Sequence, residues 1–159
     1  MARGGTNGLT MAMRLMRQTD YALRVLLYLA QRPGGHCSIT EMSRAHRISY
    51  DHLTKVVHGL VKAGYLTSIR GRMGGVRLSR DPDAINIGAI VRLMECDLDI
   101  VDCTQCVIRA GCGFRSMFDR ALGAFLATLD GETLGDILAA DRQMVWLPVQ
   151  DMGISPMIS

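Results

Sequence analysis

SITEMSRAHRISYDHLTKVVHGLVKAGYLTSIRGRMGGVRL, residues 38–78, is the stretch that decides the fold class of this chain. Its first four residues have the form of a capping box, which predicts a short helix through Ala45. Ser49 caps a longer helix that ends at Gly64, and its apolar residues recur at helical spacing: Leu53, Val56, Val57, Leu60 and Val61. Two helices joined by a tight turn predict a helix-turn-helix, whose second helix enters the major groove of DNA.

The second helix carries a polar face on the side opposite its apolar residues. That face consists of Tyr50, Asp51, His52, Thr54, Lys55 and His58. The first residues of a recognition helix are those that reach base edges. The candidate DNA-contacting residues of this segment are therefore Ser49, Tyr50, His52, Lys55 and His58. An ordinary amphipathic surface helix shows the same pattern, so the segment alone leaves both interpretations open.

The residues that follow predict a β-hairpin with a basic tip. Residues 65–69 alternate as a strand does, and RGRMGGVRL at residues 70–78 is a glycine-rich turn followed by a returning strand. Arginine suits both phosphates and a narrow minor groove, so Arg70, Arg72 and Arg77 join the candidate DNA contacts. A helix-turn-helix followed by a basic wing is far more specific than either part, and it favours double-stranded DNA as the partner.

The positive charge of the chain is concentrated in the same region. Between Arg44 and Arg80 there are eight basic residues and one acid, a net charge of +7, whereas the whole chain carries +3 and the remainder therefore carries −4. A basic block in an otherwise acidic chain is typical of a surface that binds phosphate backbones, although a solvated charged face has the same composition.

Other classes of protein lack support in the sequence. No apolar run approaches the ~20 residues that a membrane span needs. The first 13 residues lack the apolar core of a secretory signal, so we expect a cytoplasmic protein without a membrane partner. No nucleophile–base pair and no phosphate-binding loop is evident, and we do not expect an enzyme.

Four of the five cysteines lie between Cys96 and Cys112. Two residues separate Cys103 from Cys106, and five separate Cys106 from Cys112, so these three thiolates can surround one metal centre. Soft sulfur ligands favour zinc, copper(I) or an iron–sulfur cluster. Stable disulfides are rare in the cytoplasm, so we do not expect them here. The alternative to a metal site is a set of unliganded thiols. Cys96 ranks below these three as a ligand, and Cys37 is interpreted as an ordinary small residue.

A scaffold helix is predicted before the helix-turn-helix; Thr19 is expected to cap it, and its apolar face ends before Pro33. A linker helix is predicted before the cysteine loop, over residues 86–95. After the cysteines comes the strongest helical pattern of the chain: Phe114, Met117, Phe118, Ala121, Leu122, Phe125, Leu126 and Leu129. This stripe is too long for so small a domain to cover, which favours a homodimer, with burial on the chain's own core as the alternative. Thr133 caps a short final helix through Leu138.

These elements divide the chain into four parts. We expect a disordered N-terminal extension (1–12), a winged helix-turn-helix domain (13–82), a segment with linker helix, cysteine loop and dimerisation helix (83–139), and a tail (140–159). The expected fold class is mostly α, with a small β-hairpin wing.

The chain resembles the bacterial iron–sulfur winged-helix repressors typified by NsrR and IscR, from about Met13 to Leu138. The matching words are MRL at 13–15, TDYALR at 19–24, HL at 52–53 with KVVH at 55–58, GYL at 64–66, the whole wing at 70–78, and AFL at 124–126 with LD at 129–130 and TL at 133–134. The run from Leu53 to His58 is most similar to the nitric-oxide-sensing branch.

The resemblance implies a homodimer that binds promoter DNA while it carries an iron–sulfur cluster. The cluster ligands would be Cys103, Cys106 and Cys112, and a 4Fe–4S cluster would take its remaining ligand from Asp20 of the other subunit, with 2Fe–2S as the alternative cluster type. Relatives usually have more residues between the first two cysteines than the two found here, which leaves the cluster type open and keeps Cys96 as a substitute ligand. The predicted signal is nitric oxide. The alternatives are a sensor of iron or redox state, a zinc-stabilised DNA-binding protein without a sensing role, and a small electron carrier.

Overall fold

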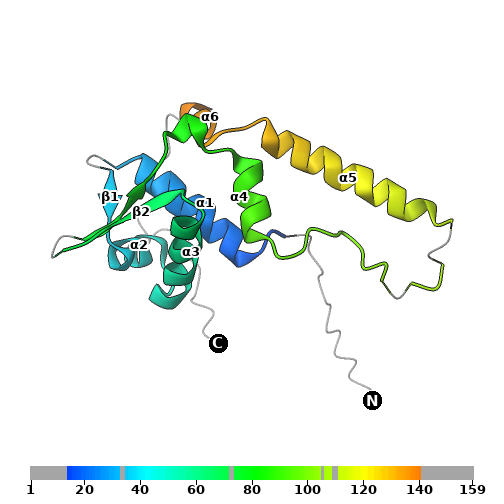
Figure 1. The fold of residues 1–159 in the computed structure, drawn as a ribbon, viewed down its shortest axis with the longest axis horizontal. Coiled ribbons are helices and arrows are strands. Elements are labelled where there is room, and N and C mark those ends of the chain that lie inside the picture. The colour runs from blue at the N-terminus through cyan, green and yellow to red at the C-terminus, as the bar shows by residue number, and fades with distance from the viewer. Residues whose placement is uncertain (1–13, 33–34, 72–73, 105, 109–110, 141–159) are drawn as a thin grey trace, which may run out of the picture.

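The computed structural model describes residues 14–32, 35–71, 74–104, 106–108 and 111–140. The expected N-terminal extension, and the tail beyond Ala140, lie outside these ranges. The protein is mostly helical with one small antiparallel sheet, as the sequence predicts (Figure 1). The elements are α1 (Arg17–Ala30), β1 (His36–Cys37), α2 (Ile39–His46), α3 (Tyr50–Lys62), β2 (Leu66–Ile69), β3 (Gly75–Leu78), the 3-10 turn η1 (Pro82–Ala84), α4 (Ile87–Met94), α5 (Gly113–Asp130) and α6 (Leu134–Ala140).

The helix-turn-helix forms where the sequence predicts it, because both of its helices have the expected serine caps. The Ser38 hydroxyl accepts a hydrogen bond from the Glu41 N–H at 3.1 Å, and the Ser49 hydroxyl accepts one from the His52 N–H at 3.3 Å. Between the helices, Arg47 adopts a left-handed conformation with φ of 53°, which turns the chain sharply after α2.

The wing belongs to a three-stranded sheet with the strand order β1-β3-β2. Strands β2 and β3 form the predicted hairpin, in which Thr67 faces Arg77 and Ile69 faces Gly75. The third strand, β1, was not predicted: its two residues pair with Val76 and Arg77. A strand this short has no alternation of its own, so only its long-range pairing defines it.

The start of α1 corrects the prediction that Thr19 caps this helix. The helix begins at Arg17 with Met16 as its N-cap residue, and no side chain caps it locally. Thr19 lies inside the first turn, is completely buried, and donates its hydroxyl proton to Oε1 of Glu95 at 2.5 Å. The threonine therefore serves a contact with a residue 76 positions away, which local sequence spacing does not reveal.

The hydrophobic core lies where α1 packs against both α3 and α4. Its fully buried side chains come from all three helices and from the final helix: Leu26, Leu29, Leu53, Leu60, Ile90 and Leu134. The predicted apolar faces of the first and third helices are thus confirmed as core. At ~1.5–3 kcal/mol for each fully buried large apolar side chain, these residues supply the main driving force for folding.

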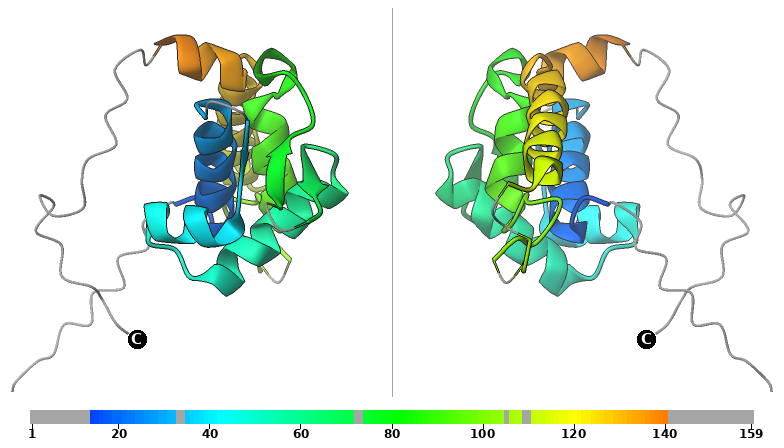
Figure 2. Two further views of the ribbon diagram at one scale, coloured as in Figure 1. Left: turned by 90° about the vertical axis from the view of Figure 1, so that its left-hand side faces the viewer. Right: turned by 90° about the vertical axis from the view of Figure 1, so that its right-hand side faces the viewer.

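The long helix α5 extends beyond the winged domain (Figure 1), and the two views of Figure 2 look along its length. None of its 18 residues is fully buried within the chain. One end is fastened to α4: Arg92 donates to both carboxylate oxygens of Asp130, at 2.5 and 2.6 Å, and the Asn86 side chain donates to the Asp130 carbonyl at 2.7 Å. Among the described residues, no helix is long and apolar enough to cross a membrane.

The apolar stripe of α5 divides into two rows. Phe118, Leu122, Leu126 and Leu129 are half-buried, while Phe114, Met117, Ala121 and Phe125 are exposed. Burial on the chain's own elements therefore accounts for one row, and the other row faces solvent. We call Phe114, Met117, Ala121 and Phe125 the outer row.

Candidate DNA interface and cysteine loop

Helix α3 presents the predicted recognition face to solvent. Its buried side consists of Leu53, Val56, Val57 and Leu60, which leaves Tyr50, His52, Lys55 and His58 exposed on the other side. Ser49 caps the helix and also shares a hydrogen bond with the His52 ring, Oγ to Nδ1, at 2.8 Å. Of the five candidates on this segment, Ser49 is thus a residue that positions His52, and the other four are free to meet DNA.

Helix α1 contributes a second set of side chains beside the recognition helix. The Tyr21 ring lies 6.4 Å from the His52 ring, centroid to centroid. A hollow of about 310 Å³ is lined there by Met16, Arg17, Gln18 and Tyr21 of the chain around the start of α1 and by His52 and Lys55 of α3. Sequence reasoning missed Arg17, Gln18 and Tyr21, whose only signal was their place on the face of α1 opposite its apolar residues.

The wing exposes arginines on a backbone that needs glycine. Arg70 directly follows β2 and Arg77 lies on β3, and both side chains are exposed. Gly71 has φ of +114°, and a Cβ on Gly74 would lie 2.6 Å from the Ile69 carbonyl oxygen, so other residues do not fit this tip. Arg72 lies outside the described residues.

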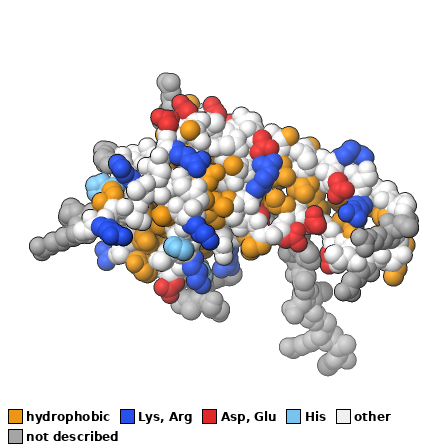
Figure 3. Space-filling view, viewed as in Figure 1, with side chains coloured by type: hydrophobic (Ala, Val, Ile, Leu, Met, Phe, Trp, Pro, Cys, Tyr) orange, Lys and Arg blue, Asp and Glu red, His pale blue; other side chains and the backbone are white. Residues whose placement is uncertain are grey.

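One arginine of the basic block has a structural task instead. The Arg80 guanidinium lies 4.4 Å from the centre of the Tyr65 ring and donates to the Gly64 carbonyl at 3.0 Å. It fastens the end of the wing to the end of α3. Figure 3 shows lysine and arginine side chains over the wing and α3, and hydrophobic side chains exposed between α4 and α5.

The cysteine loop connects the end of α4 to the start of α5. All five cysteines are free thiols; Cys103, Cys106 and Cys112 are half-buried, whereas Cys96 is exposed. The Cys106 N–H donates to the Cys103 carbonyl at 3.4 Å, which closes a turn between the first two cysteines. Before it, the Asp102 carboxylate accepts hydrogen bonds from the Thr104 N–H at 2.9 Å and from its hydroxyl at 2.6 Å, which lower the pKa of Asp102.

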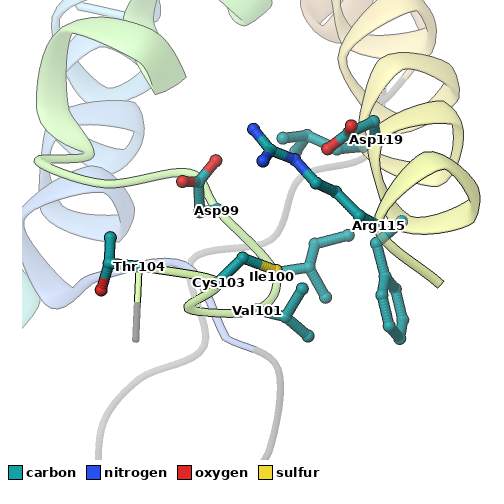
Figure 4. A pocket seen from close by; sticks show the side chains of 9 residues that line it. Asp99, Ile100, Val101, Cys103, Thr104, Arg115 and Asp119 are labelled. Carbon is teal, nitrogen blue, oxygen red and sulfur yellow. The ribbon is translucent and has the colours of Figure 1, made fainter. Parts of the chain in front are cut away.

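Cys103 lines a small cavity of about 100 Å³ between the loop and α5 (Figure 4). Its other lining residues are Asp99, Ile100, Val101, Thr104, Arg115, Phe118, Asp119 and Leu122. Cys112 is the N-cap residue of α5 and makes no capping hydrogen bond through its side chain. The two outer cysteines of the predicted ligand set are therefore both adjacent to α5.

The chemistry of this donor set fits a centre that prefers sulfur ligands, such as an iron–sulfur cluster, zinc or copper(I), because three soft sulfur donors share one loop. Within the described residues, no three His, Cys, Asp or Glu side chains are gathered closely enough to hold a metal ion. Asp20, the predicted fourth ligand, forms an ion pair with Arg24 of its own helix at 2.8 Å. The structure thus brings the cysteines to one loop and does not bring Asp20 to them within one chain.

Cys37 has the ordinary core role that the sequence predicts. Its side chain is 2% exposed at the base of the wing. Burial, together with the neighbouring Glu41, raises the pKa of the Cys37 thiol to about 12. A thiol that stays protonated is a poor metal ligand.

Comparisons with known proteins agree with this architecture. The sequence profile of the Rrf2 family, described as iron-dependent transcriptional regulators, matches residues 15–140. The chain is 46% identical over 132 residues to the HTH-type transcriptional regulator NsrR of Bacillus subtilis (strain 168), covering 79% of this chain and 90% of that protein. It is 39% identical to NsrR of Halalkalibacterium halodurans, covering 83% of this chain and 94% of that protein.

Solved structures show the same fold. CymR, the global cysteine regulator of B. subtilis, superimposes with a TM-score of 0.67 at 28% identity, over 81% of this chain and 98% of CymR. IscR of T. potens superimposes with a TM-score of 0.68 at 26% identity, over 85% of this chain and 94% of IscR. The proteins of the matched family are transcriptional regulators and not enzymes. With its winged helix, its cysteine loop and a family match over nearly its whole described length, the chain belongs to the Rrf2 family of transcriptional regulators.

Proposed function

We propose that this chain is a cytoplasmic, homodimeric repressor that binds double-stranded promoter DNA and senses nitric oxide through an iron–sulfur cluster. The observation that carries the proposal is the placement of three free, half-buried thiols on one loop of a chain that also presents an exposed recognition face. The 46% identity to a regulator named NsrR supports the same assignment.

DNA is read by two elements of the winged domain. Tyr50, His52, Lys55 and His58 project from the exposed face of α3 toward base edges in the major groove. Arg70, Arg72 and Arg77 of the wing contact phosphates and the adjacent minor groove. Ser49 orients the His52 ring through their 2.8 Å hydrogen bond.

A second copy of the chain covers the outer row of α5. Phe114, Met117 and Phe125 are 65%, 42% and 40% exposed, which is unfavourable for side chains of this size along one helix. A two-fold dimer buries both outer rows against each other and presents two recognition helices to one DNA site.

The sensing half uses the cysteine loop. Cys103, Cys106 and Cys112 would hold the cluster, 4Fe–4S in our favoured assignment and 2Fe–2S as the alternative, with Asp20 of the second copy as the remaining ligand. The cluster would supply iron that reacts with nitric oxide. While the three thiols are tied together, the loop holds α4 and α5 in one arrangement; when the thiols are released, that constraint ends and DNA affinity falls.

The experiment is a nitric oxide titration of anaerobically purified protein. It follows visible absorbance, iron and acid-labile sulfide content, and the affinity for a promoter fragment at one fixed salt concentration. We expect the absorbance and the affinity to fall together, in proportion to the nitric oxide added. An affinity that stays constant while the absorbance collapses would contradict the proposal.

Two cysteine variants serve as test and matched control. Cys112→Ala removes a predicted ligand, and we expect it to lose iron and sulfide. Cys96→Ala removes an exposed thiol of the same loop and should keep both. Normal iron and sulfide content in Cys112→Ala would exclude this ligand set.

A sensor of iron supply is the second candidate, favoured by the description of the family as iron-dependent regulators. It predicts a cluster that is indifferent to nitric oxide and is lost on iron chelation, with release of DNA. Stoichiometric zinc in place of iron would instead indicate a zinc-stabilised DNA-binding protein.

A further inference from the structure

Glu95 stands at the junction between the cysteine loop and the winged domain. It is the C-cap residue of α4 and the last residue before Cys96. Its half-buried carboxylate points away from the loop toward α1, where Oε1 accepts a hydrogen bond from the Met16 N–H at 2.8 Å and another from the Thr19 hydroxyl at 2.5 Å. One oxygen atom thus binds two residues at the start of α1, which lie 79 and 76 positions away in the sequence.

These hydrogen bonds fasten the start of α1, which has no local side-chain cap. Met16 is the N-cap residue, and no side chain of its own segment satisfies the first turn. A carboxylate near a helix N-terminus is stabilised by the helix dipole, and hydrogen bonds to a charged acceptor are the stronger kind. The position of the first turn of α1 therefore depends on Glu95, a residue of the sensing half.

The first turn of α1 in turn contacts the recognition helix. Two residues after Thr19, the Tyr21 ring lies 6.4 Å from the His52 ring, and His52 is held by Ser49 at 2.8 Å. Met16 and Arg17 line the same hollow as His52 and Lys55. A continuous series of contacts thus leads from Glu95, through the start of α1, to the exposed face of α3.

We propose that Glu95 is a positioning residue for DNA binding, which holds the start of α1 against the recognition helix and transmits the state of the cysteine loop to it. This role of Glu95 rests on the proposed function in one respect, namely that the signal is nitric oxide sensed at the cysteine loop. Glu95 lies where the loop meets α4, eight positions before Cys103, so movement of the loop reaches the winged domain through it.

Three variants test this assignment. Glu95→Ala removes the acceptor, and Glu95→Gln keeps a carbonyl oxygen at the same place. Thr19→Val removes one of the two donors with little change in shape. Glu132→Ala is the matched control, since it removes an exposed glutamate from the loop between α5 and α6. Circular dichroism and thermal unfolding show first that each variant is folded; if Glu95→Ala is not, Thr19→Val takes its place in the measurements.

The first measurement is promoter affinity at fixed salt, for the cluster-loaded protein and for the protein after nitric oxide treatment. We expect Glu95→Ala to weaken DNA binding by the loaded form about tenfold, and to bring the ratio of the two affinities close to one. Glu95→Gln should keep most of the difference in promoter affinity between the loaded and treated forms. Glu132→Ala should have the same two affinities as the unmutated protein. A Glu95→Ala protein that keeps the full ratio would overturn the proposal.

The second measurement is hydrogen exchange of the α1 amides, which needs neither cluster nor DNA. Residues 19–21, the first hydrogen-bonded amides of α1, should exchange at least about tenfold faster in Glu95→Ala, while amides in the middle of α3 remain protected. Unchanged exchange would show that Glu95 does not hold α1. If the unmutated protein has the same promoter affinity before and after nitric oxide treatment, the proposed sensing function is wrong. The exchange data still decide in that case whether Glu95 positions α1.

Discussion

Residues of one type occupy very different surroundings in this chain, and cysteine shows this most clearly. Cys37 is 2% exposed beneath the wing, where burial raises the pKa of its thiol to about 12. The three cysteines of the predicted ligand set are half-buried free thiols on a loop. Because the thiolate is the reactive form, reactivity should separate Cys37 from the others.

We predict that Cys37 resists alkylation in the native, cluster-free protein at pH 8. Iodoacetamide should modify Cys96, Cys103, Cys106 and Cys112 and leave Cys37 unmodified, as read by peptide mass spectrometry. In urea, all five should react, which serves as the control. Labelling of native Cys37 at the same rate as the loop cysteines would contradict this description of its environment.

At this scale, the sequence predicted side chains whose partners are nearby in the chain. The serine caps at Ser38 and Ser49 were predicted because a cap and its N–H lie three residues apart. Thr19 has the same chemistry, yet its partner is Glu95, and no local pattern indicates a partner 76 positions away. Arg80 was counted with the DNA-binding charge for the same reason, since its contact with Tyr65 exists only in the folded wing.

Among the elements, the sheet shows what long-range pairing adds to a local pattern. The hairpin was predicted from its glycines and its alternation, whereas β1 was missed. Strand β1 lies so close to β3 that a Cβ on Gly75 would overlap the Cys37 carbonyl, with its carbon at 2.7 Å. Gly75 is therefore required by a strand that the sequence analysis did not include, in addition to any role near DNA.

We predict that Gly75→Ala lowers the free energy of unfolding by about 1–3 kcal/mol, the usual cost of forcing extra atoms into a packed site. Urea denaturation followed by circular dichroism measures it. Gly123→Ala on α5 is the control, because a Cβ there meets nothing within 4 Å and alanine favours a helix, so stability should stay equal or rise. Equal stability of Gly75→Ala and the parent would show that β1 and β3 separate easily.

For the whole molecule, the division of α5 into two rows decides what a second copy must cover. The sequence pattern identified the complete stripe but not its division, because helical spacing does not reveal which edge the chain's own α4 occupies. Half-burial of Phe118, Leu122, Leu126 and Leu129 leaves only the outer row for a partner. The cluster ligands were likewise predicted as a set, while their mutual arrangement depends on a loop without regular structure.

We predict that Phe125→Glu converts the proposed dimer to a monomer, because it places a charge in the middle of the outer row. Sedimentation velocity should show the mass of one chain, and promoter affinity should fall at least about tenfold, because two half-sites are no longer bound together. Ala127→Glu adds the same charge on another exposed side of α5 and should leave the dimer intact. A dimeric Phe125→Glu protein would place the interface elsewhere.

The polar contacts that attach α5 to α4 lie at one end of the helix, so α5 can act as a lever. The pivot is Asp130, which accepts hydrogen bonds from Arg92 and Asn86, and the other end of the helix begins after Cys112, beside the cysteine loop. Eighteen residues at ~1.5 Å each give an arm of ~27 Å. A tilt of about 5° at the pivot then carries the far end through about 2 Å, a distance over which a hydrogen bond is made or lost. A small rotation of α5 at Asp130 would thus produce a larger displacement at the cysteine end. In the reverse direction, a displacement at the cysteine end would produce only a small rotation at Asp130.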